Sequence, residues 1–358
     1  MMEKVKISDF AEVITGGTPS TSNPEYWENG DIPWLQSGAC QNCIITECNT
    51  FITKKGLDNS AAKMMKPESV LIALTGATTG KIGFLPFEAS ANQSVTGIQP
   101  NERFISKYLY YYLRGIRQKI LDDSYGGAQK HISQGYVKNI EVPLGTIKEQ
   151  QTIADVLERV DNLISFRQRQ LQKLDDLIKA RFVEMFGDPI ENSLDLPTTR
   201  MDNRYFLKAG ITTSADDIHG IMEDDYKFPC YGGNGIRGYV NKSSYEGTYP
   251  IIGRQGALCG NIQYATGKFH ATEHAVLVTQ LENDNPIWTF YMLKLMDLNR
   301  FHTGAAQPGL AVKTLNTVNV IVADKVQQDI LRILSLRSTN QKLSCKKHWM
   351  RRSFFLTA

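Results

Sequence analysis

One feature of this 358-residue sequence limits the possible folds more than any other: an apolar heptad repeat through residues 148–186. Its main positions lie seven residues apart, at Leu157, Ile164, Leu171, Ile178 and Met185. This spacing is typical of a coiled coil, and no proline or glycine interrupts the segment. Gly187 and Pro189 follow as a stop signal. At about 1.5 Å per residue, the repeat predicts a rigid helical spacer roughly 55–60 Å long, with a coiled-coil contact along the heptad positions.

The segments on either side of this helix, 1–147 and 188–324, are weakly similar to each other. Three blocks recur in the same order at nearly one spacing: 74–82 with 254–262, 126–142 with 304–320, and 148–153 with 325–330. Ordered matches at nearly one spacing indicate an internal duplication. We therefore predict a globular domain, a long helix over 148–187, a second globular domain, and a second helical region over 325–358.

Within each globular segment the strand and helix signals are mixed. Runs rich in β-branched residues predict strands at 70–74, 140–143, 249–253 and 275–279. Longer periodic runs predict helices at 104–121 and 286–298. Because these elements do not alternate as regular βαβ units, the predicted fold class is α+β, with two pseudo-repeated domains. Glycine-rich turns in both domains suit positive φ angles or a close approach of the backbone to a ligand.

Composition excludes several classes of protein. The longest aliphatic run, residues 70–74, is far shorter than the ~20 residues that cross a bilayer. No signal-peptide core follows the first residues. Six cysteines in the sequence are too sparse for a disulfide scaffold. These features predict a soluble protein of a reducing cytoplasm that has no membrane partner.

The net charge of +3 is unevenly distributed. Residues 325–358 carry a net charge of +7, so residues 1–324 carry −4. A smooth basic surface that holds nucleic acid by charge alone is therefore not expected over most of the chain. If the protein binds DNA, the sequence favours local patches and contacts to base edges, or a basic partner that holds the duplex.

Two glycine-rich motifs resemble nucleotide sites but lack their context. Residues 233–238 form a G-x-G-x-x-G pattern, yet the residues that follow favour a turn and a strand, whereas a dinucleotide site needs a helix there. Residues 76–81 resemble a phosphate loop that is one residue short, and Ile82 replaces the Ser or Thr that would bind magnesium. Nucleotide hydrolysis is therefore not predicted.

Two further motifs are also weak signals for chemistry. Residues 23–26 (Asn-Pro-Glu-Tyr) resemble the Asn-Pro-Pro-Tyr loop of DNA adenine methyltransferases, but Glu25 replaces the second proline, and a helix-like turn is the better interpretation. Cys40, Cys43 and Cys48 lack a fourth zinc ligand nearby, so free thiols are expected. No catalytic residue and no metal ligand is predicted.

Polar side chains on the repeated, glycine-flanked loops are the remaining candidates. Arg, Lys, Gln, Thr and His suit base edges and phosphate oxygens. Composition alone favours solvated turns, but the duplication favours a split DNA target, since a rigid helix would join two different readers. The candidate DNA-binding residues are Thr75, Thr78, Thr79, Lys81, Gln129, Lys130, His131, Arg237, Arg254, Gln255 and Gln307.

Further motifs occur at 14–20 (ITGGTPS), 23–27 (NPEYW), 30–34 (GDIPW), 74–80 (LTGATTG), 149–153 (EQQTI), 231–239 (YGGNGIRGY) and 252–260 (IGRQGALCG). With these motifs, the chain resembles the specificity subunits of type I restriction-modification enzymes over essentially its whole length. The motifs are specific only when they are taken together.

The resemblance implies two target recognition domains, here 1–147 and 188–324, each reading one half of a bipartite DNA sequence. It implies that the two helical regions pair as an antiparallel coiled coil that fixes the gap between the halves. The subunit is expected to be non-catalytic, without a cofactor of its own, cytoplasmic and DNA-associated. Its expected partners are double-stranded DNA, two modification subunits that methylate adenine N6 with S-adenosylmethionine, and two restriction subunits that use ATP and magnesium.

The second helical region departs from the family pattern. The segment 325–358 is shorter than the segment 148–186, and Gln341 and His348 stand where the first helix has Ile164 and Leu171. A shortened coil is therefore expected. Two other interpretations stay open: a self-sufficient DNA adenine methyltransferase that uses residues 23–26, and a silent or phase-variable cassette product that does not assemble.

Overall fold

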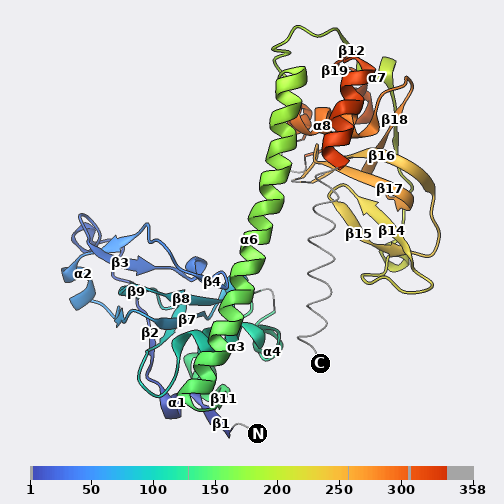
Figure 1. Cartoon of the computed structure of the whole chain (residues 1–358). Coiled ribbons are helices and arrows are strands. Elements are labelled where there is room, and N and C mark those ends of the chain that lie inside the picture. The colour runs from blue at the N-terminus through green and yellow to red at the C-terminus, as the bar shows by residue number, and fades with distance from the viewer. Residues whose placement is uncertain (1–2, 128, 257, 305–307, 337–358) are drawn as a thin grey trace. The chain divides into compact units, whose positions relative to one another are not determined.

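The computed structural model describes residues 3–127, 129–256, 258–304 and 308–336 (Figure 1). The chain divides into two units, Met1–Ser165 (unit 1) and Phe166–Ala358 (unit 2). Each unit combines antiparallel-rich sheets with helices, which confirms the predicted α+β class. The four predicted strands are present, and so are the two predicted helical segments, the first of which is divided into two helices.

Unit 1 is built on a five-stranded sheet of order β2-β10-β7-β8-β4, a four-stranded sheet of order β5-β3-β9-β6, and the pair β1-β11. Its strands are β1 (Glu3–Lys6), β2 (Val13–Thr15), β3 (Ile32–Leu35), β4 (Cys43–Ile44), β5 (Phe51–Ile52), β6 (Met64–Met65), β7 (Ser69–Ala73), β8 (Ile82–Leu85), β9 (Ala89–Ala91), β10 (Val95–Ile98) and β11 (Glu141–Leu144). Its helices and 3-10 turns are α1 (Ile7–Phe10), η1 (Pro24–Tyr26), η2 (Ser37–Ala39), α2 (Lys54–Asp58), η3 (Gly76–Thr78), α3 (Ser106–Gly115), α4 (Arg117–Asp122) and α5 (Gln134–Asn139).

Unit 2 has a six-stranded sheet of order β13-β18-β16-β17-β14-β15 and the pair β12-β19. Its strands are β12 (Thr198–Arg200), β13 (Tyr205–Ala209), β14 (Phe228–Gly232), β15 (Gly235–Val240), β16 (Tyr245–Gly253), β17 (Ile262–Ala271), β18 (Ala275–Gln280) and β19 (Asn319–Ile321). Its helices and 3-10 turns are α7 (Met201–Arg204), η4 (Ala215–Asp217), α8 (Pro286–Leu295), η5 (Leu298–Phe301) and α9 (Val312–Asn316). The chain is helical again from Lys325 to Leu336.

The main sheets of the two units share one topology. The order β2-β10-β7-β8 of unit 1 corresponds to β13-β18-β16-β17 of unit 2, and all these neighbours are antiparallel. In each sheet the next strand, β4 or β14, is parallel to its neighbour. The terminal pairs β1-β11 and β12-β19 also correspond. The structure therefore supports the duplication that the sequence blocks indicate.

The long helix α6 (Ile147–Phe186) agrees with the predicted bounds within one residue. A capping box begins it: the Glu149 carboxylate accepts the Thr146 N–H (2.8 Å), and the Thr146 hydroxyl accepts the Glu149 N–H (3.3 Å). The Thr146 N–H and the Thr146 hydroxyl both donate to the Glu149 carboxylate, and these two hydrogen bonds hold the pKa of Glu149 below its ordinary value. Gly187 ends the helix at a φ of 75°, where its N–H donates to the carbonyl of Val183 (2.8 Å).

Each end of α6 contributes to the hydrophobic core of one unit. In unit 1, Ala154 is buried in the core that α3 forms with the five-stranded sheet. In unit 2, Phe182 and Phe186 are fully buried beside Trp288 of α8, with ring centroids 6.3 and 5.9 Å from the indole. The division between the units therefore falls inside the helix, although the sequence suggested its two ends.

A buried glutamine lies near the start of α6, and another lies near the start of the helix that begins at Lys325. Each glutamine hydrogen-bonds its helix to the rest of the unit. The side-chain oxygen of Gln150 accepts the N–H of Ile105 (2.9 Å), and that of Gln328 accepts the N–H of Asn285 (2.8 Å). Gln328 is therefore the structural counterpart of Gln150. The sequence match of 148–153 with 325–330 paired Gln150 with Gln327 instead, so the register inferred for this block was wrong by one position.

Candidate nucleic-acid interface

In unit 1 the structure brings two predicted loops together. The turn at 75–81 lies against the segment 125–131, because the N–H of Gly76 donates to the carbonyl of Lys130 (3.0 Å). Within that segment, Tyr125 and His131 pair as the two sides of a small hairpin, through two backbone hydrogen bonds. The turn at 75–81 and the segment 125–131 thus form one hydrogen-bonded backbone unit, which we call the frame. Seven of the candidate residues belong to it.

The turn at 75–81 is tight, and its side chains face either the protein interior or the solvent. Gly76 and Gly80 adopt φ angles of 74° and 70°, which favour glycine. Between them Thr79 is 1% exposed, and its hydroxyl lies within hydrogen-bonding distance of the carbonyl oxygens of Gly76 (2.8 Å) and Lys130 (2.6 Å). The prediction that Thr79 contacts DNA was therefore wrong, because its side chain faces inward and holds the two loops together.

The other candidates of unit 1 reach the surface. Thr75, Gln129 and Lys130 are exposed, and Thr78, Lys81 and His131 are half-buried. The Lys130 ammonium donates to the carbonyl of Leu121 (3.1 Å), and the Lys81 ammonium donates to the side chain of Gln41. Both cations are thus positioned at the rim of the frame, and their role in DNA binding stays a prediction.

Sequence reasoning missed Tyr125 of the same frame. Its ring is 54% exposed and lies edge-on to the ring of His131, with centroids 3.7 Å apart. Exposed aromatic rings held in place by the backbone can stack on bases. The available signal was its position directly before Gly126, where one of the repeated blocks begins.

Unit 2 contains the same frame. The described residues of its turn, 254–256 and 258–260, lie against residues 303–304 and 308–310, and the hydrogen bonds of unit 1 recur at the positions that the repeated sequence blocks match. The matched backbone pairs, donor first, are Gly76–Lys130 with Gly256–Pro308, Ile132–Leu74 with Leu310–Arg254, Gly80–Ala73 with Gly260–Gly253, and Tyr125–His131 with Thr303–Gly309. Two distant sequences therefore fold into one hydrogen-bonded framework.

The candidates of unit 2 occupy defined places on this framework. Gln255 is exposed at the position of Thr75, and Arg254 next to it is half-buried. Cys259, 1% exposed, takes the inward place of Thr79. Gln307 lies outside the described residues.

Arg237 stands on a neighbouring hairpin. It is exposed on β15, the edge strand that pairs with β14. The hairpin turn approaches the frame closely, because a Cβ atom added at Gly253 would lie 2.3 Å from the carbonyl oxygen of Gly233. A strand, not a helix, follows this turn, as the sequence predicts, whereas a dinucleotide site needs a helix there.

The heptad residues of α6 differ in their surroundings. Ile178 is 3% exposed in the core of unit 2. Leu157, Ile164, Leu171 and Met185 are half-buried. The predicted partner helix is described only as far as Leu336, so most of the predicted coiled-coil contact lies outside the described residues.

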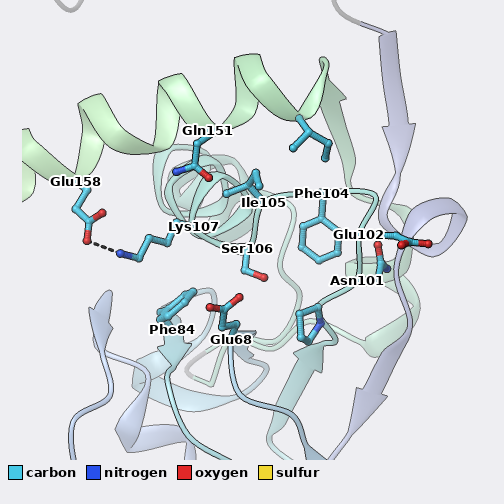
Figure 2. Close-up of a pocket in the computed structure, with 12 residues that line it drawn as sticks. Glu68, Phe84, Asn101, Glu102, Phe104, Ile105, Ser106, Lys107, Gln151 and Glu158 are labelled. Atoms are coloured by element: carbon cyan, nitrogen blue, oxygen red, sulfur yellow. Dashed lines mark hydrogen bonds and ion pairs between the residues drawn. The ribbon is translucent and has the colours of Figure 1, made fainter.

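A pocket of about 530 Å³ in unit 1 lies between α3, α6 and β8 (Figure 2). Figure 2 shows Glu68, Glu102 and Glu158 on its walls, and the ammonium of Lys107 pairs with Glu158. Three carboxylates with one paired lysine disfavour phosphate, so this pocket is not part of the candidate DNA surface.

Other chemistry is sparse in the part of the chain that the structure describes. No group of three or more His, Cys, Asp or Glu residues there could hold a metal ion. Cys40, Cys43 and Cys48 are free thiols, as expected, and Cys230 and Cys259 are free thiols as well. Burial raises the pKa of the Cys40 thiol to about 12, so it is an inert core residue. No described helix combines the length and apolar character that a bilayer span requires.

The fold and the repeated frame define a class: a tandem α+β protein whose two units present different side chains on one loop framework. The sequence matches the family described as type I restriction modification DNA specificity domain, over residues 1–176 and 212–343. The chain belongs to this family.

Individual relatives agree with the family assignment. The chain is 30% identical over 342 residues to the type I restriction enzyme EcoprrI specificity subunit of Escherichia coli, covering 90% of this chain and 83% of that protein. It is 30% identical over 194 residues to the MjaIX specificity subunit of Methanocaldococcus jannaschii, covering 52% of this chain and 44% of that one. The crystal structure of a type I restriction-modification S subunit from M. genitalium has a similar fold (TM-score 0.60, 15% identity, covering 99% of this chain and 95% of that one).

Proposed function

We propose that this chain is the DNA specificity subunit of a type I restriction-modification complex, in which each unit reads one half of a bipartite target. The observation that carries the proposal is the repeated loop frame in a chain whose family match extends over both units. A shared framework with different exposed side chains is what two readers of different sequences require, because side chains at base edges specify sequence.

The long helix supplies the spacing in this proposal. Half-sites about one turn apart, roughly 34–36 Å, lie on one face of B-DNA. A continuous helix of 40 residues spans about 60 Å and joins the two units. Its length would therefore set the number of unread base pairs between the half-sites.

Chemistry and most of the phosphate binding are assigned to partners. Residues 1–324 carry a net charge of −4, which is unfavourable for holding a duplex without help. We assign methylation of adenine N6, with S-adenosylmethionine, to two modification subunits, and ATP- and magnesium-dependent cleavage to two restriction subunits. The chain itself would be a non-enzymatic subunit that acts on DNA in the cytoplasm.

The main experiment maps methylated adenines in a host that expresses this chain with its modification subunits. The expected result is a bipartite motif with a fixed gap. Exchanging residues 188–324 for another recognition domain should change one half of the motif, while the other half is the internal control. Methylation without any bipartite motif would contradict the proposal.

The helix has its own matched experiment. Removing one heptad from the middle of α6, residues 164–170, should change the gap and leave both half-site sequences unchanged. The control is an alanine substitution at exposed Gln168, which should leave the gap as it is. An unchanged gap with altered half-site bases would contradict the role of α6 as a spacer.

The structure offers little for the alternative of a self-sufficient methyltransferase. Residues 24–26 form the 3-10 turn that the sequence predicts, and the side-chain oxygen of Asn23 is occupied by the N–H of Glu25 (3.1 Å). The Glu25 carboxylate pairs with Lys55 on α2. Incubating the purified chain alone with S-adenosylmethionine and DNA tests the alternative, and methyl transfer without partners would support it.

A further inference from the structure

Two side chains of the unit 2 frame, Gln255 and Leu258, are exposed, and within the described ranges they do not stabilise the frame through contacts of their own. Among the described residues, the Gln255 amide forms no hydrogen bond, and its side chain is exposed. Leu258 is 52% exposed, although it directly precedes the fully anchored Cys259. An exposed leucine on a rigid turn leaves apolar surface in contact with water unless a ligand covers it.

The rigidity comes from the backbone, so these side chains are free to serve recognition. Gly256 and Gly260 both adopt a φ of 81°, and the N–H of Cys259 donates to the carbonyl of Gly256 (3.0 Å). The frame thus fixes the backbone positions from which the side chains of Gln255 and Leu258 extend. In unit 1 the same two positions carry Thr75 and Thr78.

A glycine opens space beside Gln255. Gly309 pairs with Gln255 in an antiparallel bridge, at the place where unit 1 has His131. Among the described residues, a Cβ atom added at Gly309 would come no closer than 4.0 Å to its surroundings, so their packing does not require glycine there. In the part of the chain that the structure describes, the missing side chain leaves the face of the unit 2 frame more open than the face of the unit 1 frame.

On the basis of the DNA-specificity function above, we propose that Gln255 and Leu258 determine the half-site of unit 2, reading an adenine and a nearby thymine in the major groove. A glutamine amide donates to adenine N7 and accepts from adenine N6 as a bidentate pair, and an apolar side chain contacts the thymine 5-methyl group. The 5-methyl group is exposed only in the major groove, so Leu258 also fixes which groove the loop enters.

The experiment measures the affinity of the assembled complex of this chain and its modification subunits for duplexes that carry the mapped motif. In one duplex series each thymine of the unit 2 half-site is replaced by uracil, which removes only the 5-methyl group. In another, each adenine is replaced by 7-deazaadenine, which removes only the N7 acceptor. Matched complexes carry Leu258→Ala, Gln255→Ala or Gly309→His.

For the intact chain, one uracil position should weaken binding about fourfold, as expected for one methyl group. One 7-deazaadenine position should weaken it roughly tenfold. Leu258→Ala should lose the response to uracil and keep the response to 7-deazaadenine, and Gln255→Ala should do the reverse. Gly309→His should fold normally and reduce affinity for the unmodified motif, because the imidazole fills the open space.

Specific binding that is indifferent to both base replacements would overturn the assignment of Gln255 and Leu258 while leaving the specificity function intact. A unit 2 half-site without an A·T pair would also overturn it. Loss of all preference for the mapped motif in the intact complex would instead contradict the proposed function. Equal responses to uracil in the Leu258→Ala and intact complexes would exclude Leu258 as the reader.

Discussion

At one equivalent position, the two units are stabilised by opposite kinds of side-chain contact. At the end of the first short helix of unit 1, Phe10 packs edge-on against Phe104, with ring centroids 5.2 Å apart. At the equivalent place in unit 2, Arg204 forms a two-pronged ion pair with Asp284, at 2.6 and 2.7 Å. Asp284 is 6% exposed and also accepts hydrogen bonds from Tyr205 (3.1 Å) and Gln328 (2.8 Å). An apolar pair and a buried charged network support the same backbone.

The comparison shows what duplication has retained. Sheet order and the backbone hydrogen bonds of the loop frame recur, whereas the side chains differ even in the core. A backbone that tolerates a Phe pair or an ion pair at one place also tolerates different readers on its surface. We infer that the framework of each unit is independent of the half-site that it reads.

The largest predicted effect comes from breaking the charged network. Asp284→Ala leaves the 19%-exposed Arg204 guanidinium unpaired, which should cost unit 2 about 3 kcal/mol. Unit 1 should be unaffected. Fluorotryptophan labelling with ¹⁹F NMR measures the unfolding of each unit separately, since Trp34 reports on unit 1 and Trp288 reports on unit 2.

The double variant Arg204→Phe with Asp284→Phe is the matched control, because it copies the pair of unit 1. Replacing a buried ion pair by apolar residues is often neutral or stabilising, so most of the lost stability should return. A double variant as unstable as Asp284→Ala would mean that the two units need different contacts at this place.

A smaller difference is expected between the two glutamines that anchor the helices. Gln150→Ala removes hydrogen bonds to Ile105 and to the carbonyl of Gly145 (2.9 Å), and should destabilise unit 1 by about 1–3 kcal/mol. Gln328→Ala should cost unit 2 more, since Gln328 also donates to a carboxylate. Denaturant titrations followed at Trp34 and Trp288 measure both, and equal losses would contradict the difference.

The two units should also unfold at different pH values in acid. Burial opposes ionisation of Asp284, but hydrogen bonds from Arg204 and Gln328 and the guanidinium charge outweigh it and hold its pKa below the ordinary value. A carboxyl with a depressed pKa stabilises the folded state above its unfolded pKa of about 3.9, and this contribution disappears as the pH falls through the folded value. Trp288 should therefore report acid unfolding before Trp34 does, and the double Phe variant should remove that order.

The smallest predicted effect concerns the surface of the frame. Gln255→Ala and Leu258→Ala should change the stability of unit 2 by less than about 0.5 kcal/mol, because exposed side chains away from caps and cores contribute little. Thermal unfolding monitored at Trp288 checks this. A large loss at either position would mean that the side chain supports the frame rather than reading a ligand.

Much of the architecture could be predicted from local patterns. The heptads predicted α6 within one residue, since periodic burial and a Gly-Pro stop are local signals. The duplication followed from repeated blocks. The register of the last block could not be read, because Gln327 and Gln328 are adjacent and only Gln328 accepts the N–H of Asn285.

The candidate site was predictable in part for a similar reason. Sequence placed the polar loops, but not the hydrogen bonds between Gly76 and Lys130, which join residues far apart in the chain. Thr79 looks like Thr75 and Thr78 in the sequence, yet the glycine-bounded turn directs it inward. Tyr125 was missed because its exposure depends on the hairpin that it forms with His131.

We infer that one loop framework, present in both units, carries exchangeable side chains that read DNA. Transplanting the unit 1 side chains, as Gln255→Thr with Leu258→Thr, and mapping methylated adenines in a host with the modification subunits tests it directly. One half of the motif should change, while the other half and the gap are preserved. A motif altered in both halves, or not at all, would contradict it.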